Sequence, residues 1–294
     1  MSLKINQLTK TYSNGVRALD GIDLEIGVGM FGLLGPNGAG KSSLMRTIAT
    51  LQSADNGSIL FDGMDIFANQ MDFRKVLGYL PQDFGVYPNL SAEELLSYFA
   101  QLKGISSAAD RKKIVNEVLE VTNLYAVRKK NVSGYSGGMK QRFGIAQLLL
   151  NKPKLIIVDE PTAGLDPAER HRFLNVLREI GTSNTVIFST HIVDDVRELC
   201  HELAIVNGGR VLYRGTAQAG EEALEGKIWS TVILRDDYEA VSKEQNVIFA
   251  NYNPDNTLNV RVYSEVSPGE NFSMAKPILE DVYFVSLKND TAHV

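Results

Sequence analysis

Cysteine, long apolar runs and dense positive charge are all scarce in this sequence of 294 residues. The single cysteine, Cys200, cannot form an intramolecular disulfide, which fits a reducing cytoplasm. The longest apolar stretches, such as those at 148–150 and 155–158, are far shorter than the roughly 20 residues that a membrane-spanning helix needs. These shortages exclude a disulfide-rich secreted scaffold and predict that no segment of this chain crosses a membrane.

The charge balance and the first residues exclude two further classes. The 30 Lys and Arg residues against 35 Asp and Glu residues give a formal net charge of -5, without a dense Lys/Arg run. Because extended contact with nucleic-acid phosphates requires clustered cations, we expect no nucleic-acid partner. The opening run MSLKINQLTK lacks the apolar core of a secretory signal, so we expect a cytoplasmic protein.

The sequence does contain a clear alternation of strand and helix patterns. Residues 3–26 alternate apolar and polar side chains around a short turn, which predicts antiparallel strands. Compact apolar runs then alternate with stretches that favour helices, with strands expected at 30–34, 155–158 and 185–189 and helices at 41–51 and from Asp166 onward. This order predicts an α/β fold in which helices cover a parallel sheet.

A helical insertion interrupts the α/β pattern. The segment from about 84 to 151 shows little strand signal. Ser91 and Glu94 form a capping box at the start of one helix, and a second helix is expected at 109–121.

The C-terminal quarter predicts a separate small module. The sequence Asn-Gly-Gly at 207–209 lies between two apolar stretches and predicts a hairpin turn. Residues 217–226 resemble a helix or a linker, and 228–287 show alternating strand patterns. We therefore expect a main domain over 1–218 and a small α+β module over 219–294.

The run GPNGAGKSS from Gly35 is typical of a loop that holds phosphate groups. Gly35, Gly40, Lys41 and Ser42 have the spacing that lets backbone N–H groups point inward at a β-phosphate. Lys41 would neutralise phosphate oxygens, Ser42 would bind Mg²⁺, and the following helix adds its positive N-terminal dipole. An ordinary glycine turn is the alternative, but a strand before and a helix after favour a phosphate loop. Its residues are Gly35, Pro36, Asn37, Gly38, Ala39, Gly40, Lys41, Ser42 and Ser43.

Two carboxylates follow the strand expected at 155–158. Asp159 should emerge at the carboxyl end of the sheet beside the phosphate loop, where it can hold magnesium through water. Glu160 points elsewhere and is the candidate to orient or deprotonate an attacking water. The alternative is that both residues are solvated acids at a strand end. Their pairing with the loop at Gly35 makes this the minor alternative.

With the run YSGGMKQR from Tyr135 added, the sequence over about 1–218 resembles the ATP-binding-cassette (ABC) ATPases. The match to the family's Leu-Ser-Gly-Gly-Gln motif is made by Ser136, Gly137 and Gly138, whereas Tyr135 and Met139 depart from it. The resemblance implies a dimer in which this motif contacts the γ-phosphate of ATP bound by the other subunit, homomeric or heteromeric. A helix starting at Ser136 also offers free N–H groups to an anion.

Further matches to the family follow in order along the chain. Gln82 corresponds to the glutamine that reaches magnesium and the attacking water, although a lone glutamine is more often a surface residue. Asp166 matches a loop at the dimer interface, and its simpler role is to cap the next helix. His191 matches a hydrogen-bond donor to the γ-phosphate. Tyr12 matches the aromatic residue that stacks on adenine, with a packed or exposed loop tyrosine as the alternative.

The resemblance also implies what the cassette drives. The function is ATP hydrolysis with Mg²⁺ that powers a transporter whose pore is a separate transmembrane permease, with this chain on the cytoplasmic face of the membrane. The surface at 82–95 is the expected docking groove, with Asp83, Phe84, Tyr87 and Pro88 as exposed candidates. The tail PILEDVYF at 277–284 is similar to tails of drug-exporter and ABC-2 subunits, which favours export.

Three other functions could use some of the same motifs. A soluble ABC ATPase that acts as an assembly or remodelling factor would share every catalytic residue. A DNA-repair type of ATPase would need a longer insertion or a zinc site, and a small-molecule kinase would leave YSGGMKQR without a purpose.

Overall fold

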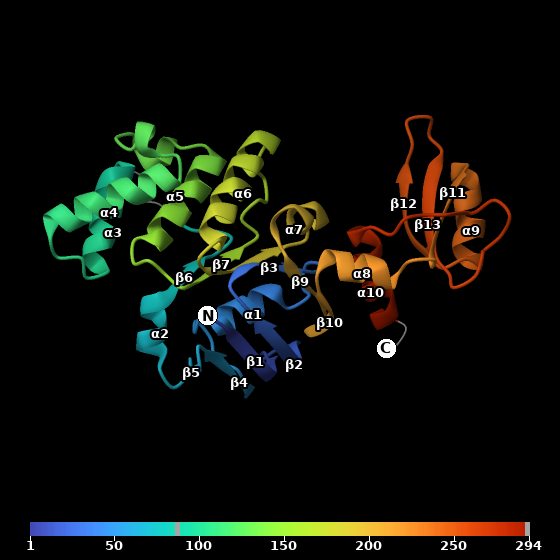
Figure 1. Ribbon diagram of the computed structural model, residues 1–294, viewed down its shortest axis with the longest axis horizontal. Coiled ribbons are helices and arrows are strands. Elements are labelled where there is room, and N and C mark those ends of the chain that lie inside the picture. Colours follow the sequence, from blue (N-terminus) through green and yellow to red (C-terminus); the bar gives the residue numbers. More distant parts are fainter. Residues whose placement is uncertain (86–88, 292–294) are drawn as a thin grey trace.

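A six-stranded sheet lies at the centre of the computed structural model, which describes residues 1–85 and 89–291 (Figure 1). The strand order is β10-β9-β3-β8-β7-β6, in which neighbours from β9 to β6 run parallel and β10 runs antiparallel to β9. The strands are β3 (Gly29–Leu34), β6 (Leu77–Leu80), β7 (Leu155–Asp159), β8 (Thr185–Thr190), β9 (Glu202–Asn207) and β10 (Arg210–Gly215). The expected α/β fold is confirmed.

One face of this sheet packs against α1 (Lys41–Ile48) and a second, antiparallel sheet. Because alternate side chains of a strand point to opposite faces, Phe31 and Leu33 of β3 both lie in this layer. The second sheet has the order β2-β1-β4-β5 and pairs Leu3 with Ile26, which confirms the strands expected at 3–26. Its strands are β1 (Leu3–Thr11), β2 (Arg17–Ile26), β4 (Asn56–Phe61) and β5 (Met64–Asp65).

Helices cover the opposite face of the central sheet. Met30, Ile156 and Phe188, from three neighbouring strands, pack there against α5 (Gly137–Leu149) and α6 (Pro167–Gly181). The chain then folds back through α7, which is followed by Cys200. Burial raises the pKa of the Cys200 thiol. The other helices of this part are α2 (Gln70–Val76) and α7 (Val193–Leu199).

The helical insertion has an apolar core of its own. The helices α3 (Ala92–Leu102) and α4 (Ala108–Val121) pack on α5, with the short 3₁₀ turns Tyr125–Val127 and Val132–Gly134 between them. The capping box predicted at Ser91 and Glu94 is present at the start of α3. Over the described ranges, 1–85 and 89–291, every helix is too short or too polar to span a membrane.

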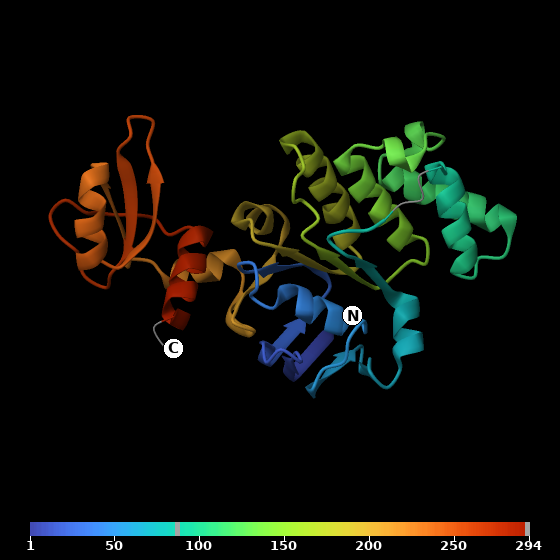
Figure 2. The same cartoon turned by 180° about the vertical axis from the view of Figure 1, so that it is seen from behind.

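The C-terminal unit lies at the end of the molecule opposite α3 and α4, as the front and back views show (Figures 1 and 2). Its sheet has the order β12-β13-β11-β14, and α8 leads into it from the central sheet. Its elements are α8 (Ala217–Ala223), β11 (Ile228–Ile233), a 3₁₀ turn (Arg235–Asp237), α9 (Tyr238–Glu244), β12 (Val247–Tyr252), β13 (Leu258–Tyr263) and β14 (Ser273–Met274).

The strand pattern expected up to residue 287 is wrong at its end, because the chain forms the helix α10 (Leu279–Thr291) there. Leu279, Val282 and Tyr283 have the i, i+3, i+4 spacing of one helix face and are buried. They share one apolar cluster with Leu34 and Ile205 of the central sheet. The tail therefore packs on the central sheet as well as on the C-terminal unit.

A buried ion pair joins the C-terminal sheet to α10. The guanidinium of Arg261 on β13 donates two hydrogen bonds to the carboxylate of Asp281, at 2.8 Å from Nε and 2.5 Å from Nη2. The Asp281 side chain is fully buried and also accepts the backbone N–H of Ile278 at 2.9 Å. Because a buried carboxylate is costly without its partners, this pair fixes α10 against β13.

We expect Arg261→Ala to destabilise the C-terminal unit by about 3 kcal/mol, since the Asp281 carboxylate would remain buried without its counter-charge. Trp229 on β11 is the single tryptophan, so its fluorescence during urea unfolding reports on this unit. Lys243→Ala is the matched control, because Lys243 forms an exposed pair with Glu239 that contributes little. Equal unfolding midpoints for the two variants would contradict the role given to the buried pair.

Candidate active site

Three parallel strands bring their carboxyl ends to one edge of the central sheet. Leu34 of β3 pairs with Thr190 of β8, and Asp159 of β7 pairs with Ser189 of β8. The phosphate loop, the two carboxylates and His191 follow directly after these strands in the chain. Ligands of open α/β sheets bind beyond the carboxyl ends of the strands, so this edge is the candidate site.

A cavity of about 580 Å³ opens at this edge. It combines the phosphate loop with residues that lie far away in the sequence, from the turn between β1 and β2, the start of β2, the loop after β6, the end of β7 and the turn after β9. Its lining residues are Tyr12, Val16, Arg17, Ala18, Asn37, Gly38, Ala39, Gly40, Lys41, Ser42, Ser43, Gln82, Glu160 and Gly208. The structure therefore brings most of the predicted site residues together, while their individual roles stay predictions.

Lys41 is the central charge of the cavity. Its side chain is only 4% exposed, and Nζ donates to the carbonyl oxygens of Gly35 at 2.7 Å and Pro36 at 3.1 Å. Glu160 Oε1 lies 3.4 Å from the same nitrogen. The ammonium group lies beside the N-terminus of α1, and both are suited to bind an anion, while the Glu160 carboxylate balances the charge of Lys41.

Backbone crowding explains why the loop needs a glycine before Lys41. Gly40 has φ +104°, and a Cβ atom there would lie 2.4 Å from the carbonyl oxygen of Ala18. Any other residue would be strained and would also push β2 away from the loop. The glycine spacing read from the sequence therefore has a steric cause in the contact between the loop and β2.

Ser189 organises the two carboxylates. Its hydroxyl donates to Asp159 Oδ1 at 2.7 Å and accepts the backbone N–H of Glu160 at 3.1 Å. Glu160 has φ +44°, a left-handed conformation that costs a non-glycine residue free energy. Its Oε2 lies 3.3 Å from Nδ1 of His191, so the carboxylate sits between Lys41 and His191. The sequence analysis overlooked Ser189, although a serine at the end of a buried strand was a usable signal.

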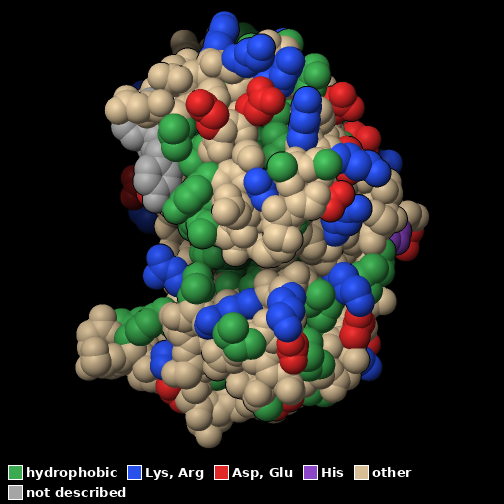
Figure 3. Space-filling model, turned by 90° about the vertical axis from the view of Figure 1, so that its left-hand side faces the viewer, with side chains coloured by type: hydrophobic (Ala, Val, Ile, Leu, Met, Phe, Trp, Pro, Cys, Tyr) green, Lys and Arg blue, Asp and Glu red, His purple; other side chains and the backbone are tan. Residues whose placement is uncertain are grey.

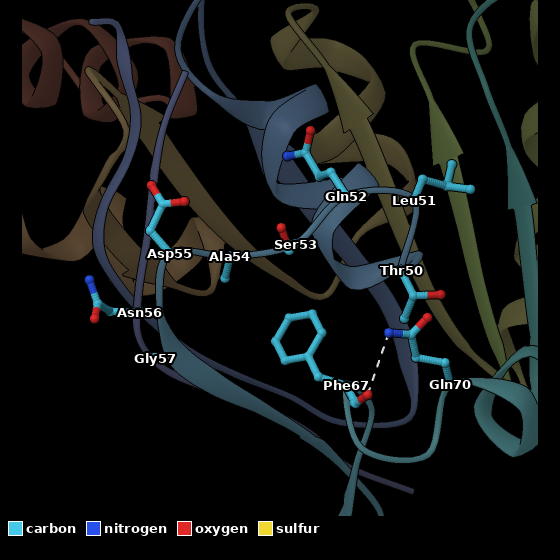
Figure 4. A pocket seen from close by; sticks show the side chains of 10 residues that line it. All are labelled: Thr50, Leu51, Gln52, Ser53, Ala54, Asp55, Asn56, Gly57, Phe67 and Gln70. Atoms are coloured by element: carbon cyan, nitrogen blue, oxygen red, sulfur yellow. Dashed lines mark hydrogen bonds between the residues drawn. The ribbon is translucent and has the colours of Figure 1, made fainter. Parts of the chain in front are cut away.

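Tyr12 is held by hydrogen bonds that the sequence analysis did not anticipate. Its hydroxyl lies 2.9 Å from Ser43 Oγ and donates to Gln52 Oε1 at 3.1 Å. The Gln52 amide in turn donates to the carbonyl of Ser43 and to the hydroxyl of Thr47. Gln52 also borders a second cavity of about 500 Å³ beyond the end of α1, where its amide is directed toward that helix (Figure 4). A single glutamine after a helix gives no sequence signal for such a role.

The residues of the YSGGMKQR run lie elsewhere. Ser136 caps α5 by accepting the N–H of Met139 at 3.2 Å, and Ser136 and Gly137 are exposed. Gly138 is buried, and a Cβ atom there would lie 2.3 Å from Oε2 of Glu169. The described residues that line the 580 Å³ cavity do not include these three. Close packing against Glu169 therefore explains the glycine at position 138, apart from any contact with an anion.

Asp166 also lies outside that set of lining residues, and it has the capping role that the sequence predicted. Its carboxylate accepts the backbone N–H of Glu169 at 2.9 Å at the start of α6. Glu169 itself pairs with Arg142 of α5 at 3.0 Å. The cap and this pair tie the starts of α5 and α6 to each other.

The expectation of an exposed Phe84 is wrong. Phe84 is half-buried, and its ring packs so close to α5 that a Cβ atom at Gly144 would lie 2.8 Å from Phe84 Cζ. Asp83 is exposed as expected. Tyr87 and Pro88 lie outside the described residues.

Comparison with known proteins identifies the family of this chain. Residues 19–163 match the family described as ABC transporter. The uncharacterised ABC transporter ATP-binding protein YxlF of Bacillus subtilis is 36% identical over 218 residues, which cover 74% of this chain and 72% of YxlF. The linearmycin resistance ATP-binding protein LnrL of the same species is 37% identical over 187 residues, covering 63% of this chain and 60% of LnrL.

Solved structures agree with these relatives. CbiO1 from Clostridium perfringens, part of the transporter complex cbiONQ, has a TM-score of 0.69 at 30% identity, covering 76% of this chain and 92% of CbiO1. The dimeric cassette MJ0796 in a post-hydrolysis state with ADP and Pi has a TM-score of 0.65 at 26% identity, covering 73% and 98%. The chain therefore belongs to the ABC transporter family, with the fold of its ATP-hydrolysing subunits.

Proposed function

We propose that this chain is the ATP-hydrolysing subunit of an ABC exporter, in which two such subunits drive a separate transmembrane permease. The observation that carries the proposal is the contact series from Lys41 to Glu160 to His191 beside the phosphate loop. It supplies a cation for phosphate oxygens and a carboxylate for water in the lining of the cavity, and a hydrogen-bond donor in contact with that carboxylate.

The chemistry assigned to these residues is transfer of a phosphoryl group from ATP to water. Lys41 exchanges its carbonyl partners for phosphate oxygens, and the N–H groups of the loop and of α1 bind the rest of the triphosphate. Glu160 orients the attacking water and accepts its proton. His191 holds the second oxygen of that carboxylate and can donate to the γ-phosphate, while the ring of Tyr12 stacks on adenine.

The donor set of the cavity fits Mg²⁺. Ser42 and Gln82 line the cavity and contribute a hydroxyl and an amide oxygen, and Asp159, buried at the end of β7, contributes a carboxylate. These are the hard oxygen ligands that this ion prefers. Ser189 fixes the Asp159 carboxylate through its 2.7 Å hydrogen bond. Bound magnesium would neutralise charge on the phosphate oxygens, and these residues would hold it beside the phosphate loop.

Two copies of the chain, or this chain and a similar one, would complete each site. The residues Ser136 to Gly138 and Asp166 lie outside the cavity lined by the phosphate loop, yet Ser136 and Gly137 are exposed at a helix N-terminus. An exposed helix N-terminus attracts an anion. We therefore assign these residues to the γ-phosphate held by the facing subunit, an arrangement supported by the similarity to a dimeric cassette.

The face that carries α2 and α3 is the proposed docking surface for the permease. Figure 3 shows this face hollowed between the helical part and the β part, with apolar side chains along the hollow. Met71 on α2 is 72% exposed, Tyr98 on α3 49%, and Leu51 after α1 61%. Apolar side chains at these levels of exposure suit an amphipathic helix of a membrane subunit. We therefore assign the chain to the cytoplasmic face of the membrane.

Export is favoured over import, and transport over soluble remodelling, by the kinds of relatives that the chain has. LnrL is named for linearmycin resistance and YxlF as an ABC transporter ATP-binding protein. A remodelling factor would keep the catalytic residues but would not need the apolar hollow between α2 and α3.

We expect Glu160→Gln to slow ATP hydrolysis at least ~100-fold while leaving ATP binding intact, because the amide spares the phosphate contacts but cannot accept a proton. Steady-state phosphate release gives the rate, and size-exclusion chromatography with Mg-ATP should show a trapped dimer. Exposed Glu239→Gln on α9 is the matched control and should hydrolyse ATP normally. Turnover of Glu160→Gln at the control rate would remove Glu160 from the mechanism.

We expect Ser136→Arg to abolish hydrolysis while each subunit still binds ATP, because bulk would fill the place where the facing nucleotide docks. Ser136→Ala, which removes the helix cap without adding bulk, should lose about 1 kcal/mol of stability and keep part of its activity. Mixing Ser136→Arg subunits with Lys41→Ala subunits should restore one active site in a dimer. A fully active Ser136→Arg protein would reject the shared site.

A further inference from the structure

The tight turn between β9 and β10 braces the phosphate loop from behind. Gly208 and Gly209 have φ +52° and +76°, as a two-residue hairpin turn of type I′ requires. The N–H of Gly209 donates to the carbonyl of Ala39 in the phosphate loop at 3.0 Å, and its carbonyl accepts the N–H of Asp20 at 2.9 Å. Gly208 lines the nucleotide cavity itself. A shift of this turn would therefore move the loop.

The C-terminal end of α10 holds the same turn. Asp290 accepts a hydrogen bond from the side-chain amide of Asn207 through Oδ2, at 2.9 Å. On the other side of the turn, Arg210 pairs with Asp20 at 2.6 Å, and Asp20 pairs with Arg17 of the cavity lining at 2.5 Å. The carboxylates of Asp20 and, at longer range, Asp290 raise the pKa of Arg210. The last turn of α10 thus belongs to a chain of polar contacts that reaches the cavity.

The other end of α10 is anchored in the C-terminal unit. Asp281, in the first turn, makes the buried bidentate pair with Arg261 of β13. The helix rises about 13 Å from Asp281 to Asp290, at about 1.5 Å per residue step. Between these two contacts, Val282 and Val285 are buried in the cluster shared with the central sheet. A helix fixed along its length and at both ends moves as one piece.

We propose that α10 positions the phosphate loop for nucleotide binding, with Asn207 and Asp290 as positioning residues, so that the seating of the C-terminal unit sets nucleotide affinity. This inference rests on the proposed nucleotide site at Lys41. Neither residue touches the nucleotide, and both act through the Gly209 to Ala39 hydrogen bond.

Binding of Mg-ADP to the full chain, measured by isothermal titration calorimetry, tests this inference without interference from hydrolysis. We expect Asp290→Ala to weaken binding about 5-fold, because hydrogen bonds to charged groups are stronger than those between neutral groups and part of the lost stabilisation is transmitted to the loop. Asn207→Asp should weaken binding at least as much, since it sets two carboxylates against each other while keeping a residue that suits the turn. The KM for ATP should rise by a similar factor, with kcat changed less than about 2-fold.

The combined variant Asn207→Asp with Asp290→Asn reverses donor and acceptor and should recover most of the lost affinity. Asn289→Ala, an exposed change on the same helix turn, is the control and should bind as the parent chain does. If Asp290→Ala lowers the melting temperature but leaves the Kd of Mg-ADP unchanged, the contact is merely structural and the inference is wrong. Lys41→Ala keeps the two proposals apart, because unchanged binding in that variant would reject the nucleotide site itself.

Discussion

The structure depends on how closely three backbone segments approach one another around the phosphate loop. A Cβ atom at Gly35 would lie 2.2 Å from the carbonyl oxygen of Val206 on β9, and one at Gly40 would lie 2.4 Å from that of Ala18 on β2. The loop is thus shaped by main-chain contacts with both of its neighbouring strands. Because main chain cannot move aside like a flexible side chain, the loop keeps its form, and Lys41 is held where its ammonium group can meet a phosphate.

The same crowding explains why residues far apart in sequence act on one cavity. Glu160 and His191 are placed by the pairing of β7 and β8, and Tyr12 by its hydrogen bonds to Ser43 and Gln52. Each of these elements packs on the face of the central sheet or at its edge. The register of the central sheet therefore determines the geometry of the site. A register change in β8 would displace Glu160 and His191 together.

Much of the fold could be predicted from periodicity and turn chemistry, because those signals are local. The strands at 3–26 and the Asn-Gly-Gly turn carry such signals and are confirmed, and the glycine-rich run from Gly35 leads from β3 into α1 as expected. The tail at 279–291 forms a helix and not the expected strand, because a run rich in Val, Tyr and Phe suits both and packing on Leu34 and Ile205 decides between them. Gln52, Ser189 and Asp290 act through partners 9 to 83 positions away, which a single sequence does not reveal. The boundary at residue 218 stays a prediction, since α10 belongs to both parts.

The packing of Gly138 affects how amino-acid changes in the YSGGMKQR run are to be understood. The absent side chain makes room for Glu169 of the same subunit, whose carboxylate is bound to Arg142. An alanine at this position would strain the subunit itself, whether or not a second copy binds. If a substitution at Gly138 abolished activity, a defect within the subunit could not be told apart from failed assembly of two subunits. A substitution at the exposed Ser136 separates these two causes.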